Sequence, residues 1–187
     1  MKKFKIWKTI TIGKKPSSEG INISSNAQSM LDKIKWDKNE TLDLVRIKVK
    51  DLKIEEDYPT TKQIYAKVKK LGLSFCPPQV GLPLRVDYKD QPLNEWLFMG
   101  MKPIFDSDGR PYVFNVERHD DGLWLYDRWE DPGYKWNPDD QFVFSLRKSL
   151  KPLKSSLKLK SLDTLTFKSL GKRIKILERK IEKIKKI

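Results

Sequence analysis

The sequence predicts an α+β domain in which two helices pack on a mostly antiparallel β-meander sheet, followed by a basic amphipathic helix. Two segments near the front carry apolar residues at helical spacing, and short aromatic-rich segments behind them are separated by Asp-Gly turns. Charge divides the chain as well, because residues 147–187 hold 15 Lys and Arg against 3 Asp and Glu, whereas residues 1–146 are nearly neutral. We therefore expect a globular domain over residues 4–147, a basic linker over 148–160 and a basic, coiled-coil-like helix over 161–187.

The two expected helices are marked by caps and by apolar stripes. The first runs from a capping serine at position 24 or 25 to about residue 36, with Met30, Leu31 and Ile34 on one face. The second is expected over residues 61–71, after a capping threonine, and Gly72 ends it. Both helices are amphipathic, so each can bury one face against a sheet.

The expected strands follow from alternating side chains and from turn residues. Residues 4–12 and 42–50 alternate in a strand-like way, and residues 84–88 begin another extended segment after a run of prolines. Asp-Gly turns at 106–109 and 120–122 separate the first three strands of the expected meander. The segments of that meander are 96–102, 112–117, 123–126 and 142–146.

Composition argues against several classes of function and location. Cys76 is the only cysteine and His119 the only histidine, so an intramolecular disulfide is impossible and no metal site is expected. No segment approaches the ~20 apolar residues of a membrane span, so we expect no membrane-spanning helix, and a membrane is not the favoured partner. The single cysteine favours a reducing compartment, and the expected location is the cytoplasm. We find no phosphate loop or cofactor motif, so no cofactor is expected.

Cys76 and His119 can be interpreted in two ways. They would form a nucleophile–base pair if the fold brought them together. Each also fits a structural role, because Cys76 lies between Phe75 and Pro77, where a small buried residue is common, and His119 precedes an Asp-Asp-Gly turn. We expect the structural roles.

A long aromatic loop is expected between the last two strands, over residues 126–140. It contains Tyr126, Trp129, Tyr134 and Trp136 among acidic residues, with Pro and Gly as breakers. The acidic residues argue against nucleic acid at this loop and favour a basic or neutral partner. Long loops between strands often carry binding, and Trp and Tyr are common interface anchors. The sequence leaves open the alternative that these side chains fold back as a lid over the sheet core.

Several short segments of the body resemble those of a known group of proteins. They are 71–81 (LGLSFCPPQVG), 88–92 (YKDQP), 95–97 (EWL), 101–104 (MKPI), 106–109 (DSDG) and 122–125 (GLWL). On these segments the chain resembles a family of uncharacterised bacterial proteins, many from uncultured lineages, over roughly residues 7–148. The resemblance implies a domain boundary before the tail and a bacterial cytoplasmic origin, and it assigns no activity and no catalytic residue.

The basic tail carries a heptad seam. Its apolar residues recur at spacings of three and four: Phe167, Leu170, Ile174, Leu177, Ile181 and Ile184. The seam predicts association with a protein partner or with a second copy through residues 167–184, as a parallel pair of helices. The sequence leaves open that the seam packs on its own domain or that the tail lies on an anionic membrane surface. The alternative is nucleic-acid binding through phosphates, for which the expected contacts are Lys172, Lys175, Arg179 and Lys183.

These patterns favour a non-enzymatic interaction module that associates through its C-terminal helix. Sequence-nonspecific nucleic-acid binding through the basic tail is the second hypothesis, because the chain shows no base-reading motif. An enzyme with a carboxylate-based site that the sequence does not reveal is the third. No catalytic residue is assigned.

Overall fold

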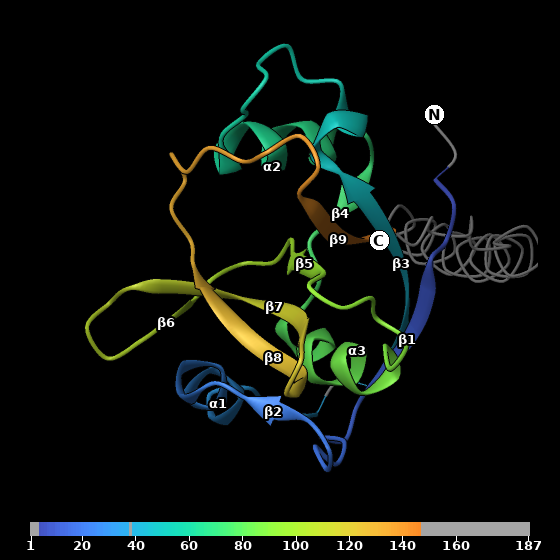
Figure 1. Cartoon of the computed structure of the whole chain (residues 1–187), viewed down its shortest axis with the longest axis vertical. Helices are drawn as coiled ribbons and strands as arrows, with labels where there is room; N and C mark the ends of the chain where they lie inside the picture. The colour runs from blue at the N-terminus through green and yellow to red at the C-terminus, as the bar shows by residue number, and fades with distance from the viewer. Residues whose placement is uncertain (1–3, 38, 147–187) are drawn as a thin grey trace, which may run out of the picture. The chain divides into compact units, whose positions relative to one another are not determined.

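The fold is a curled β-sheet with short helices on both of its faces (Figure 1). The computed structural model describes residues 4–37 and 39–146. All nine strands in these residues belong to one sheet, in the order β1-β3-β9-β5-β7-β8-β2, with β4 paired to β9 and β6 paired to β7. The strands are β1 (Lys8–Ile12), β2 (Asn22–Ile23), β3 (Glu40–Lys48), β4 (Leu73–Ser74), β5 (Trp96–Met99), β6 (Ile104–Phe105), β7 (Pro111–His119), β8 (Gly122–Trp129) and β9 (Gln141–Leu146). The helices are α1 (Ser25–Asp32), α2 (Thr61–Lys70) and α3 (Gly81–Asp87), with short 3-10 helices η1 (Val49–Leu52) and η2 (Pro78–Val80).

The expected fold class, two helices on a mostly antiparallel meander, is wrong. The sheet is mixed, because β5 runs parallel to β9 and β2 runs parallel to β8. It is not a meander either, since β9, the last strand in the described residues, lies between β3 and β5. Strands that follow one another in sequence are neighbours more often than not, and the expectation followed that rule. The alternation of side chains within one strand does not indicate which strand, distant in sequence, it pairs with.

Two of the three helices begin where capping residues predict. Ser24 Oγ accepts the N–H of Ala27 at the start of α1, and Thr60 and Gln63 form a reciprocal capping box at the start of α2. The third helix, α3, lies where an extended segment was expected. Pro83 is tolerated there because it occupies the first turn, where backbone N–H groups have no partner within the helix.

Each face of the sheet has its own hydrophobic core. We name as the inner face the one packed by α1 and α3, through Met30 and Leu84 among others. The outer face is packed by α2, whose Ile64 and Val68 lie in one cluster with Phe142. Because side chains alternate along a strand, successive residues of β7 and β8 belong to opposite faces.

The expected linker (148–160) and basic helix (161–187) lie outside the described residues, and so do the seam and the expected phosphate contacts. Within residues 4–37 and 39–146, no helix has both the length and the apolar character that crossing a membrane requires. The longest of these helices, α2, has 10 residues.

Candidate functional site on the outer face of the sheet

The aromatic residues that were expected in one loop lie on two faces of the sheet. β8 extends to Trp129, so Tyr126 and Trp129 belong to a strand and not to the loop. Trp129 pairs with Tyr112 on the inner-face side, whereas Tyr126 pairs with Asn115 on the outer face. Three of the four expected residues therefore share the outer face: Tyr126, Tyr134 and Trp136.

Trp136 covers the outer-face core beside α2. Its ring centroid lies 4.7 Å from those of Phe98 and Phe142, and its indole N–H donates to Thr61 Oγ1 over 2.9 Å. Trp136 is 5% exposed, whereas the neighbouring Tyr134 is 40% exposed. Trp136 thus shields the core from water, and Tyr134 presents a ring to solvent.

Beyond this cover, four rings form a row across β5, β7 and β8, which we name the aromatic face: Trp96, His119, Tyr126 and Trp124. Successive ring centroids along this row are 6.4, 6.2 and 5.2 Å apart. The order follows from strand register, since Trp96 and Trp124 both pair with Glu117. Trp96 is 47% exposed, so the row reaches the surface.

On the same face, β7 carries three polar side chains at alternate positions: Asn115, Glu117 and His119, the last of which is also one of the four rings. One carboxylate oxygen of Glu117 accepts a hydrogen bond from Asn115 Nδ2, and the other lies 2.7 Å from His119 Nε2. The Glu117 side chain is 8% exposed, and a buried carboxylate requires partners of this kind. These polar side chains of β7 were not expected to form a site. Polar residues at every second position of a strand are the signal that could have revealed them.

Two polar groups on the outer face lack hydrogen-bond partners among the residues that the structure describes. Asn115 Oδ1 is buried and accepts no hydrogen bond. The Arg128 guanidinium, which has no acceptor within the described ranges, lies over three aromatic rings. Its Cζ atom is 4.3 Å from the ring centroid of Tyr134, 5.0 Å from that of Trp136 and 5.5 Å from that of Phe98. Cation–π contact stabilises the charge and leaves the N–H groups available to an acceptor.

A buried arginine on the inner face holds the segment that leads into the aromatic face. Arg85 on α3 is 0% exposed and donates to Gln91 Oε1 and, over 3.0 Å, to Glu117 O. Gln91 Nε2 donates in turn to the carbonyl of Glu95 over 2.9 Å, directly before Trp96. Burial lowers the pKa of the Arg85 guanidinium to about 10. Arg85 therefore fixes the position at which β5 begins.

The structure does not bring Cys76 and His119 together. Cys76 is buried in the inner-face core, with its Sγ 3.7 Å from Val143 O, whereas His119 contacts Glu117 on the outer face. Burial raises the pKa of the Cys76 thiol to about 12, which leaves little reactive thiolate. In the part of the chain that the structure describes, no group of three or more His, Cys, Asp or Glu residues could hold a metal ion.

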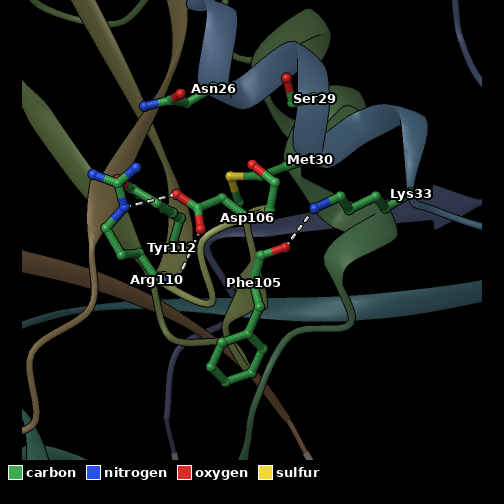
Figure 2. A pocket seen from close by; sticks show the side chains of 9 residues that line it. Asn26, Ser29, Met30, Lys33, Phe105, Asp106, Arg110 and Tyr112 are labelled. Carbon is green, nitrogen blue, oxygen red and sulfur yellow. Dashed lines mark hydrogen bonds and ion pairs between the residues drawn. The ribbon is translucent and has the colours of Figure 1, made fainter.

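A separate pocket of about 340 Å³ lies between α1 and the turn that joins β6 to β7 (Figure 2). Its charged groups bond within the protein. Lys33 Nζ donates to Phe105 O over 2.5 Å, and Arg110 Nε donates to Asp106 Oδ2 over 3.0 Å. Figure 2 shows both contacts as dashed lines. The pocket offers space, but Lys33, Asp106 and Arg110 already have partners within the protein.

Comparison with known proteins gives no match: no family model, no curated protein and no solved structure is significantly similar to this chain. The resemblance to a family of uncharacterised bacterial proteins therefore stays a prediction. The site has to be interpreted from its own geometry.

Proposed function

We propose that this chain is a non-enzymatic interaction module whose body contacts its partner through the aromatic face. One observation carries the proposal: exposed rings lie beside a donor, Arg128, and an acceptor, Asn115, that have no partners within the described residues. The two groups are neighbours, because Arg128 lies over the ring of Phe98, and Phe98 pairs with Asn115. Buried polar groups are nearly always paired in folded proteins, so the unpaired Asn115 Oδ1 marks this region as unusual, and the free N–H groups of Arg128 are available to a ligand on the surface.

Binding fits this face better than catalysis does. The Glu117 carboxylate is buried, and both of its oxygens have partners in Asn115 and His119. A general acid or base must exchange its proton with a substrate, which requires an accessible oxygen or nitrogen. Aromatic and Arg side chains, in contrast, are the usual anchors of binding surfaces.

Ligand-induced NMR shifts test the proposal. In ¹H–¹⁵N spectra of the full chain, a panel of single-stranded oligonucleotides, oligosaccharides and unstructured peptides should include a ligand that shifts the aromatic-face signals. The expected signals are the indole N–H groups of Trp96 and Trp124 and the Nε–H of Arg128. Trp129 is the matched control, because it is exposed on the opposite side of the sheet. A panel that leaves the face unchanged, or that shifts Trp129 alone, contradicts the proposal.

We propose that the tail adds self-association to this function. The heptad seam over residues 167–184 supports this, since apolar residues at a and d positions bury one another across a pair of helices. Replacing Ile174 and Ile181 by Asp is expected to convert a dimer into a monomer in light scattering, because unpaired carboxylates in the seam are strongly unfavourable. Replacing Lys175 and Lys183, which lie outside the seam, by Asp is the control and should leave the dimer intact. A wild-type chain that stays monomeric at high concentration removes this part of the proposal.

We also propose a cytoplasmic location. Cys76 is the only cysteine and is buried, so no intramolecular disulfide would stabilise the body in an oxidising compartment. Fractionation of cells that express the tagged full chain tests the location.

A further inference from the structure

The ligand of the aromatic face can be specified further, and this step rests on the proposed function. We propose that the face binds single-stranded nucleic acid, with bases stacked on Trp96 and its neighbouring rings and with Arg128 bound to a base edge or a phosphate. The rings come from three adjacent strands of one sheet, with successive centroids 5.2 to 6.4 Å apart. Aromatic side chains on a sheet surface are the means by which several single-strand binding domains hold unpaired bases.

The free N–H groups of Arg128 match the edge of a base. The guanidinium lies over three rings, and a nucleobase edge presents acceptors to which its N–H groups can donate. Asn115 is 2% exposed, so its Oδ1 is not part of this contact. A guanidinium stacked on rings also suits phosphate, whose oxygens accept from its planar fork of N–H groups.

Charge favours a polyanion over the other ligands of the panel. The chain has a net charge of +14, and residues 147–187 contribute +12 of it. A net charge of this size favours a polyanion over a basic peptide or a neutral oligosaccharide. Of the acidic residues in segment 126–140, Asp127 bonds Ser24 on the inner side of the sheet, and Asp139 pairs with Lys48 and Lys50.

Fluorescence anisotropy with labelled oligo-dT of about 20 nucleotides, longer than most single-strand sites, tests this inference on the full chain. Replacing Trp96 by Ala is expected to weaken binding about tenfold, since one stacking contact is lost. Trp129→Ala removes a comparably exposed ring from the opposite side and should change affinity by less than about twofold. Trp96→Phe, which keeps a ring, should recover most of the affinity. Circular-dichroism melting of each variant confirms that it folds.

Salt dependence separates the face from the tail. Replacing Lys172, Lys175, Arg179 and Lys183 by Gln should flatten the plot of log affinity against log salt, since each phosphate contact on a single strand contributes about 0.7 to the slope. Trp96→Ala should lower the affinity without changing that slope.

Three results would overturn the inference. The first is an equal loss of affinity in Trp96→Ala and Trp129→Ala, and the second is binding of duplex DNA as tight as that of oligo-dT, which indicates phosphate contacts alone. The third is an oligosaccharide or peptide that shifts the NMR signals of the face while oligo-dT does not. In that case the proposed function stands and the nucleic-acid ligand is wrong.

Discussion

Replacing Arg85 by Ala is expected to lower the free energy of unfolding of the body by about 4 kcal/mol, a large part of the stability of an ordinary domain. Arg85 is 0% exposed and donates to Gln91 Oε1, Tyr88 O and Glu117 O. Without the guanidinium these acceptors remain in the core with fewer donors. Each acceptor that stays unpaired lowers the stability by about 1–3 kcal/mol. The shortened side chain also leaves a cavity, which lowers the stability further. Loosening of this contact also releases the segment before Trp96, so the aromatic face loses its support.

Urea unfolding followed by tryptophan fluorescence measures the effect of the Arg85 substitution. Arg85→Lys keeps the charge but not the planar fork, so we expect an intermediate loss. Arg110→Ala is the matched control, because Arg110 is an exposed arginine whose ion pairs contribute about 1 kcal/mol or less. If Arg85→Ala unfolds at the same urea concentration as the Arg110 variant, Arg85 does not hold the segment.

Replacing Gly100 by Ala is expected to destabilise the body by about 3 kcal/mol. An added Cβ at this position would lie 1.9 Å from Cε1 of Phe144, which is 0% exposed in the outer-face core. The backbone cannot move away freely, since Gly100 donates to Val143 O and accepts from the N–H of Cys76, both over 2.9 Å. Overpacking of a closed core forces side chains out of their rotamers or shifts the strands apart.

A second substitution shows whether the clash with Phe144 causes the loss of stability in Gly100→Ala. In a Phe144→Val background, which lacks the clashing ring carbons, Gly100→Ala should cost less than about 1 kcal/mol. Gly13→Ala is the control, because a Cβ there would meet Asn39 Oδ1 at an ordinary 3.7 Å. Equal costs of Gly100→Ala with and without the Phe144 ring would show that the backbone, and not the ring, opposes the methyl group.

The sequence could predict the local parts of this fold. Ser24 and Thr60 mark helix starts, and the Asp-Asp-Gly turn joins β7 to β8 with His119 opposite Gly122. The place of β9 could not be predicted, because its residues look like those of any half-buried strand and do not indicate that it separates β3 from β5. Helix α3 was missed because prolines suggested an irregular segment, whereas Pro83 fits a first helical turn.

The candidate site was predictable only in part. The aromatic residues of segment 126–140 attracted attention, but the length of β8 decides that Tyr126 and Trp129 lie on opposite sides of the sheet. Trp96 and Trp124 are distant in sequence and come together only through the register of β5 and β8 on β7. Long-range pairing thus creates the face, and a single sequence does not reveal such pairing.

Ultraviolet cross-linking of oligo-dT to the full chain, followed by mass spectrometry of tryptic peptides, tests most directly whether the aromatic face contacts bases. Zero-length cross-links form only between a base and a side chain that touches it. Trypsin cleaves after Arg118 and Arg128, so peptide 119–128 carries three of the four rings, and a separate peptide carries Trp129. We predict cross-links in peptide 119–128 or at Trp96, in addition to any in the tail. Cross-links confined to residues 147–187 or to Trp129 would contradict the binding face proposed for this protein.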